Sequence, residues 1–213
     1  MGTIIKLVTL ILAIEMILFI VISSIPVNNP EVASEAEKMI NDIASQPNYL
    51  NIVTSIFTNN IIVTGISFIP VVGIGFLGYA IYNTGYALSA LSTSQDLPGS
   101  LVALLLFISP HSVTEFLSYA ISSAAGLILI WKRKVRTSLY MFGISVLDLF
   151  VAAMIEGAIL YDYSLMFILW LPTLGFIALV FILLRKIERG LQGEGKGDLS
   201  PTLPPPLPPS LSP

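Results

Sequence analysis

The chain has 213 residues, of which 55% are hydrophobic and only 11% charged, and its mean hydropathy is +0.88. Soluble domains carry about 25% charged residues, so this composition excludes a water-soluble enzyme domain and a disordered chain, and it indicates a polytopic membrane protein. The net charge of −3 excludes a basic surface for nucleic acid, and the lack of cysteine excludes disulfides and thiolate sites.

Six stretches are long and apolar enough to be membrane-spanning helices, each of which needs about 20 mainly apolar residues. The sequence therefore predicts an all-α bundle over residues 1–189. A further apolar stretch, Leu101–Ser109, is too short to span. The predicted spans are Leu7–Ile25, Leu50–Ile69, Gly75–Leu91, Val113–Trp131, Leu139–Leu160 and Leu165–Leu184.

The basic residues predict the orientation of these spans, because cytoplasmic loops close to a membrane are rich in Lys and Arg. Lys6 precedes the first span, a basic cluster at 132–136 follows the fourth, and a second cluster at 185–189 follows the last. The segment 26–50 is acidic by contrast. We therefore expect a multi-pass protein of the cell membrane, with both termini in the cytoplasm and segment 26–50 outside.

The short stretch before Pro110 needs a different structure, because the chain passes there from an acidic loop at Asp96 to the basic cluster at 132–136. Passing from the outer side of the membrane to the cytoplasmic side requires an odd number of crossings. One full-length span lies between Asp96 and the basic cluster. We therefore expect 101–109 to form a half-helix or re-entrant segment. Pro110 would begin the next helix at its first position, where the missing N–H is not needed. The break should be buried in the bundle, since unpaired backbone is not tolerated against lipid.

Residues 30–46 are predicted to form an amphipathic helix outside the membrane. Asn29 is a suitable N-cap, and Pro30 suits the first helical position. The acidic residues lie on one side of this helix and the apolar residues on the other. We expect the apolar side to dock on the outer end of the bundle, with partner binding as the alternative. That side comprises Val32, Ala36, Met39, Ile40 and Ile43.

The last segment, 190–213, differs in composition from the bundle. Glycines alternate with charged residues over 193–197, and a proline-rich run with PxxP spacing begins at Pro201. Such a run favours polyproline II and lacks the apolar residues of a packed core. We expect a disordered, proline-rich cytoplasmic tail, and the alternative is a docking segment for another protein.

Ionisable and amide side chains within the spans are the strongest indications of function, because each is costly in lipid unless it is paired. His111 and Glu115 are four residues apart, so they share one face of a helix. Ser118, Ser122 and Gly126 continue that face as a stripe of small residues. We expect an intramembrane polar core that comprises Glu15, Asn59, Asn60, His111, Glu115, Asp148 and Glu156.

Three interpretations of His111 and Glu115 stay open. They could be a hydrogen-bonded pair that fixes the helix break, beside small residues that allow close packing. They could line a path for protons or ions. They could also bind a metal or act as acid and base, although a catalytic metal would need further ligands such as Glu156 or Asp148.

The other polar residues are expected mainly to serve the packing of the helices. Asn59 and Asn60 should make hydrogen bonds between helices, because amides in hydrocarbon need partners. Glu15 must face the inside of the bundle. Asp148, near the middle of its span, should face a polar cavity. Glu156 lies in the outer half of its span, where it could pair with His111.

Several short segments carry a family resemblance by their order and spacing over about residues 50–160. They are Phe57–Asn60, Gly73–Gly75, Asn83–Gly85, Pro110–Glu115, Ala124–Leu127 and Ala152–Glu156. Through them the chain resembles the stage II sporulation protein M family of integral membrane proteins, with Pro110–Glu115 the most specific segment. Ser112 and Ser89 depart from the family, which usually has glycine at the first position and commonly at the second.

The resemblance implies a membrane-embedded component of a multi-protein complex. In spore-forming bacteria such a protein anchors cell-wall hydrolases during engulfment, and relatives occur in bacteria and archaea that do not sporulate. The resemblance supplies no enzymatic activity for named residues.

We expect a non-catalytic membrane scaffold with no cofactor and no nucleic-acid partner. Its partners would be membrane lipid, other membrane or envelope proteins, or further copies of itself. The alternative is a transporter, a channel or a transporter subunit, with a polar path lined by His111, Glu115, Ser118 and Ser122. A metal-dependent intramembrane hydrolase is a third hypothesis, which needs more ligands than the sequence obviously offers.

Overall fold

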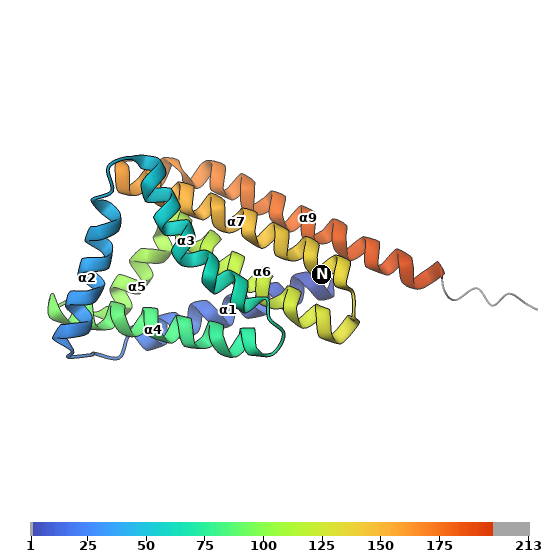
Figure 1. The fold of residues 1–213 in the computed structure, drawn as a ribbon, viewed down its shortest axis with the longest axis horizontal. Coiled ribbons are helices and arrows are strands. Elements are labelled where there is room, and N and C mark those ends of the chain that lie inside the picture. The colour runs from blue at the N-terminus through green and yellow to red at the C-terminus, as the bar shows by residue number, and fades with distance from the viewer. Residues whose placement is uncertain (1, 198–213) are drawn as a thin grey trace, which may run out of the picture.

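The computed structural model describes residues 2–197, and the regular structure in that range is entirely helical (Figure 1). The expected all-α class is therefore confirmed. The helices are α1 (Thr3–Ser23), α2 (Pro30–Ala44), α3 (Tyr49–Ser67), α4 (Val72–Ser94), α5 (Gly99–Ile108), α6 (Pro110–Lys132), α7 (Val135–Tyr161), α8 (Leu165–Ile168) and α9 (Trp170–Gly197). Most of the predicted proline-rich tail, residues 198–213, lies outside the described residues.

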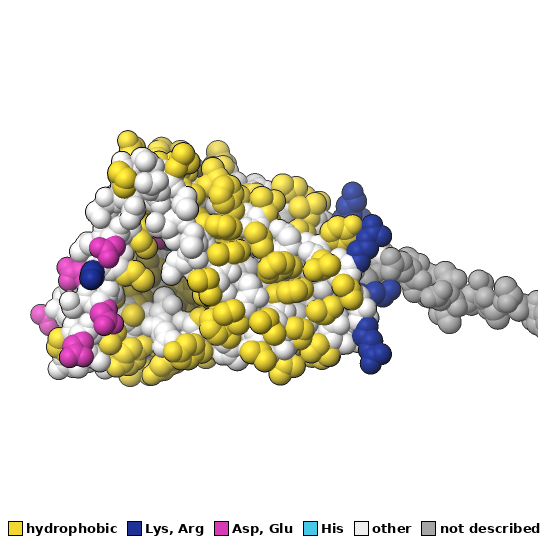
Figure 2. Space-filling view, viewed as in Figure 1, with side chains coloured by type: hydrophobic (Ala, Val, Ile, Leu, Met, Phe, Trp, Pro, Cys, Tyr) yellow, Lys and Arg dark blue, Asp and Glu magenta, His cyan; other side chains and the backbone are white. Residues whose placement is uncertain are grey.

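The long helices lie roughly along the long axis of the molecule, and α2 lies across one end (Figure 1). Acidic side chains gather at the end that α2 covers, and Lys and Arg gather at the opposite end (Figure 2). We call these the acidic end and the basic end. A broad hydrophobic surface separates them (Figure 2). This distribution is that of an integral membrane bundle, in which an apolar belt faces lipid and the charged ends face water.

Five helical segments are each long and apolar enough to cross a membrane, namely α1, α3, α6, α7 and Leu165–Gly190. Helix α4 passes the same test together with α5, which is bent from it by 116°. Counting that bent pair as one span gives six within the described residues, which agrees with the predicted number.

The short helix before Pro110 is present. Helix α5 has ten residues and ends at Ile108, and Pro110 is the first residue of α6, as predicted. Ser109 between them is only 6% exposed. The indole Nε1 of Trp170 donates a hydrogen bond of 2.7 Å to the carbonyl of Ile108. The break is therefore buried and its carbonyl is satisfied, as backbone at membrane depth requires.

Helix α6 is the centre of the bundle and packs against α1, α3, α4, α5, α7 and α9. Its middle carries small residues, which let neighbouring elements approach closely. A Cβ atom at Gly126 would lie 2.5 Å from the carbonyl oxygen of Phe68. The apolar core on this helix comprises Leu117, Ala120, Ile121, Ala124, Ala125 and Ile128, packed against Ile4, Val8, Met141 and Leu184.

Helix α2 begins as predicted. The side chain of Asn29 caps it by accepting a hydrogen bond of 3.3 Å from the N–H of Val32, and Pro30 occupies its first turn. The helix packs mainly against α4, where Ala33 is buried, and also against α3. Helix α2 therefore lies on the end of the bundle, but the residue that it buries is not one of the face expected to dock, and Met39 and Ile40 of that face remain exposed.

The start of α1 and the C-terminal part of α9 meet at the basic end of the molecule. The carboxylate of Glu188 on α9 accepts a hydrogen bond of 2.9 Å from the backbone N–H of Ile4. Glu188 is buried, and its charge lies at the N-terminus of α1, where the helix dipole favours an anion. The start of α1 and the C-terminal part of α9 therefore lie on one side, as an even number of crossings requires.

Helix α9 continues to Gly197, past residue 190, where the composition predicts a flexible tail. The residues between 190 and 197 include Leu, Gln, Glu and Lys, which favour helices, and they contain no proline. The last helix therefore extends beyond the predicted boundary at 189, although its apolar run ends at Leu184, before Arg185 and Lys186.

Candidate functional site

A cavity of about 370 Å³ lies between α2 and the rest of the bundle, at the acidic end. Residues from all of the helices α1 to α7 line it. Figure 2 shows a hollow in the surface beside α2. Met39 and Ile40 of α2 line the cavity and are 53% and 46% exposed. The apolar side of α2 thus forms one wall of a cavity and is not fully packed.

Five polar side chains line this cavity from α6 and α7, and we call the four of them other than Ser112 the polar cluster. They are His111, Glu115 and Tyr119 on α6 and Glu156 on α7. The remaining lining is largely apolar, and it includes Phe107 of α5, whose ring packs edge to face against Phe19 and Phe116. Electrostatic interactions within the polar cluster are strengthened by such apolar surroundings.

Hydrogen bonds connect the polar cluster in a pattern that differs from the expected one. The hydroxyl of Tyr119 donates to Oε1 of Glu115 over 2.6 Å. His111 Nδ1 is hydrogen-bonded to the hydroxyl of Ser109 over 2.7 Å. The expected bond between His111 and Glu115 is therefore replaced by two others, because His111 lies in the first turn of α6 and reaches back to the helix break.

Glu156 of the neighbouring helix α7 lines the same cavity as Glu115, so the cavity holds two carboxyl groups. Tyr119 interacts electrostatically with both and also with Glu15 of α1. Two carboxyl groups that share one cavity repel each other when both are ionised, so such a site favours a proton or a cation between them. His111 bonds to Ser109, and the suggested pairing of Glu156 with His111 is not among the hydrogen bonds of the described residues.

The polar cluster does not have the geometry of a metal site. Within residues 2–197, no three side chains of His, Asp or Glu come close enough together to hold a metal ion. The arrangement instead suits binding or transfer of a proton, or binding of an organic cation through charge and aromatic contact.

The two asparagines of α3 also line the cavity, opposite the polar cluster. Their side chains bond to each other, with Asn59 Nδ2 donating to Asn60 Oδ1 over 3.2 Å. The expected hydrogen bonds from these amides to other helices are therefore replaced by one within α3, and Asn59 is exposed beside α2.

Asp148 and Glu15 lie inside the bundle but outside the cavity lining. Asp148 is fully buried and Glu15 is 2% exposed, so the prediction that Glu15 faces inward is confirmed. Asp148 does not face a polar cavity as expected, because α7 turns it toward the packed interior. Among the described residues, neither carboxyl group has a hydrogen-bond partner.

The small-residue stripe joins helices and does not line the cavity. The hydroxyl of Ser118 lies 3.3 Å from that of Thr64 on α3 and donates to the carbonyl of Ser145 on α7 over 2.9 Å. Ser122 donates to the carbonyl of Thr64 over 2.7 Å. Both serines are fully buried, so of the four residues expected to line a polar path, His111 and Glu115 line this cavity and Ser118 and Ser122 do not.

Tyr119 is the member of the polar cluster that the sequence analysis missed. It follows Glu115 by four residues and so lies on the same helical face, which is the signal that points to it.

Comparison with known families agrees with the resemblance noted in the sequence. The family model described as Stage II sporulation protein M matches residues 7–159, which include α1 to α6 and most of α7. No curated protein and no solved structure matches the chain.

Proposed function

This chain belongs to the stage II sporulation protein M family, and we propose that it is a non-catalytic scaffold subunit of a membrane protein complex. The observation that carries this proposal is the placement of α2. This helix lies across the acidic end, is held against α4 by its buried side, and carries exposed acidic residues. The exposed acids are Glu31, Glu35, Glu37 and Asp42.

The surface of α2 suits binding of a basic partner outside the membrane. Charges exposed at a protein surface steer and select partners of opposite sign. Because α2 is already fixed to the bundle, a partner that binds it is anchored to the membrane. We place this end outside the cell membrane and the basic end in the cytoplasm, since basic residues collect on the cytoplasmic side.

Affinity capture tests the scaffold proposal. The tagged full chain is purified from native membranes in mild detergent, and the proteins that accompany it are identified by mass spectrometry. Glu31→Gln combined with Glu35→Gln and Glu37→Gln should remove a stoichiometric partner, because it removes the charges that bind it. The control is Asp96→Asn, which removes an exposed acid in another loop. Recovery of the chain alone, or equal capture by the triple variant, would contradict the proposal.

The cavity favours a second candidate function, in which the protein conducts protons or cations. The specific observation is that Glu115, Glu156 and Tyr119 interact within a cavity that lies at one end of the membrane bundle. Proton flux into vesicles that contain the full chain and a pH-sensitive dye tests it. Glu115→Gln should abolish the flux, whereas Glu37→Gln on the exposed side of α2 should leave it unchanged. Flux no greater than that of empty vesicles would exclude this function.

A further inference from the structure

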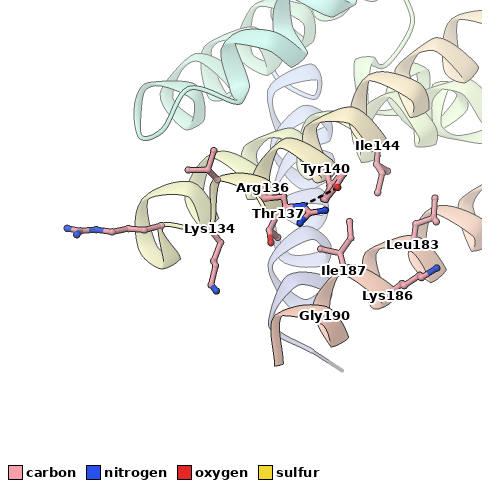
Figure 3. A pocket seen from close by; sticks show the side chains of 11 residues that line it. Lys134, Arg136, Thr137, Tyr140, Ile144, Leu183, Lys186, Ile187 and Gly190 are labelled. Atoms are coloured by element: carbon pink, nitrogen blue, oxygen red, sulfur yellow. Dashed lines mark hydrogen bonds between the residues drawn. The ribbon is translucent and has the colours of Figure 1, made fainter. Parts of the chain in front are cut away.

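A second cavity lies at the basic end, far from the polar cluster. It is a groove of about 760 Å³ between the N-terminal turns of α7 and the C-terminal half of α9 (Figure 3). Its volume is within the range of sites that hold small organic ligands. The lining residues are Arg133, Lys134, Val135, Arg136, Thr137, Tyr140, Ile144, Leu183, Lys186, Ile187 and Gly190.

The charged residues that line the groove are basic. Arg133 and Lys134 come from the turn between α6 and α7, Arg136 from α7 and Lys186 from α9, and none of the lining residues that the structure describes is acidic. Arg136 is held in place, because its Nε donates to the hydroxyl of Tyr140 over 3.1 Å and its guanidinium carbon lies 5.5 Å from the centre of that ring. An arginine fixed in this way is suited to bind a phosphate group.

The backbone of α7 adds to this preference for an anion. The first three residues of the helix line the groove, and neither a side-chain cap nor an acidic residue is present in its first turn. The N–H groups at the start of a long helix favour a negative charge, so they act in the same direction as the basic side chains.

The other part of the groove is apolar. Ile144 of α7 and Leu183 and Ile187 of α9 line it, as Figure 3 shows. Beyond them, toward the hydrophobic belt, the two helices continue with exposed apolar side chains such as Leu147 on α7 and Leu179 on α9. A ligand that fills the groove therefore needs an anionic head and an apolar chain that runs along α7 and α9.

We propose that this groove binds one anionic phospholipid, with its phosphate among Arg136, Lys186 and the first turn of α7 and an acyl chain against Ile144 and Leu183. Charge complementarity and the position of the groove at the edge of the apolar belt favour a lipid over a soluble anion. The bound lipid would join α7 to α9 at the basic end.

Lipid binding by matched variants tests the proposal. The full chain in mild detergent is titrated with phosphatidylglycerol or phosphatidylcholine, and bound lipid is counted by native mass spectrometry. The double variant Arg136→Gln with Lys186→Gln, which we call the groove pair, removes one arginine and one lysine from the groove. The double variant Lys132→Gln with Arg185→Gln, which we call the control pair, also removes one lysine and one arginine. Both residues are exposed at the same end of the molecule but do not line the groove.

The wild-type chain and the control pair should retain one phosphatidylglycerol in preference to phosphatidylcholine. The groove pair should bind it about 25-fold more weakly, at about fivefold for each basic residue near an anionic lipid. Equal losses in the two pairs would show diffuse surface attraction and would overturn the proposal. Competition by glycerol phosphate as strong as that by the lipid would also overturn it, since the site would then serve a soluble anion.

A conservative variant keeps the test decisive if the groove pair does not fold. Arg136→Lys keeps the charge but loses the planar contact with the Tyr140 ring and the two-pronged phosphate geometry. Its affinity for phosphatidylglycerol should be several times lower than that of the wild-type chain. Unchanged phosphatidylglycerol binding by Arg136→Lys would place the lipid elsewhere and overturn the proposal.

Discussion

The carboxyl group of Glu115 is held by a tyrosine from its own helix. The bond of 2.6 Å from Tyr119 is short, and both side chains lie where α1, α6 and α7 meet. A hydrogen bond to a group that can be charged contributes more than one between neutral groups, particularly away from water. The position of the carboxyl group in the cavity therefore depends on Tyr119.

Tyr119→Phe should lower the free energy of unfolding by about 1–3 kcal/mol, the usual cost of leaving a buried hydrogen-bonding group without its partner. The ring and its packing are kept, so the change isolates the hydroxyl. Unfolding of the purified protein in detergent measures the effect. Tyr82→Phe, at an exposed position on α4, should change the stability little. Equal stability of the two variants would show that the Tyr119 hydroxyl contributes nothing.

His111 is coupled to the helix break and not to Glu115. Its bond to Ser109 predicts a coupling of about 0.5–1.5 kcal/mol between the two positions in a double-mutant cycle. Ser109→Ala and His111→Ala should each destabilise the protein, and the double variant should be little worse than either. The parallel cycle of His111→Ala with Glu115→Gln should be additive. Coupling in the second cycle and none in the first would contradict this assignment.

At the scale of the elements, close approach to α6 depends on its small residues. The carbonyl of Phe68, at the end of α3, lies where a side chain at Gly126 would begin. Ser118 and Ser122 occupy the same face and bond to α3 and α7. The stripe is therefore a packing surface, which fixes α3 and α7 around the polar cluster.

Gly126→Ala should destabilise the protein by about 1–3 kcal/mol, because the added methyl group forces α6 away from its neighbour. The matched control is Gly143→Ala on α7, where an added Cβ meets nothing within 4 Å. That control should be neutral or slightly stabilising, since alanine favours a helix over glycine. Thermal unfolding of both variants compares them, and equal losses would show that the close approach is unimportant.

The elements were predictable because their signals are local. Runs of apolar residues fix the spans, and the caps at Asn29, Pro30 and Pro110 act within one helical turn. The partners of polar side chains were not predictable, because they depend on how each helix is rotated in the bundle. That rotation turns Ser118 toward α3 and α7 and places Glu188 beside Ile4, although the two are 184 residues apart in sequence.

At the scale of the whole molecule, the two ends differ in charge and in the cavities that they carry. The acidic end carries α2, the cavity and the polar cluster, and the basic end carries the groove between α7 and α9. The start of α1 and the later part of α9 meet at the basic end, which leaves the acidic end to α2 and the loops. This division suits a protein that is anchored at one side of a membrane and presents a binding surface at the other.

Site-specific photo-crosslinking in living cells tests most directly whether α2 is the surface that holds a partner. A photoreactive residue replaces Glu37, which is exposed on α2, and in a control it replaces Leu171, which is 81% exposed on the apolar belt. The account predicts one defined protein adduct from position 37 and no such adduct from position 171. No protein adduct from position 37, or the same adduct from both positions, would contradict it.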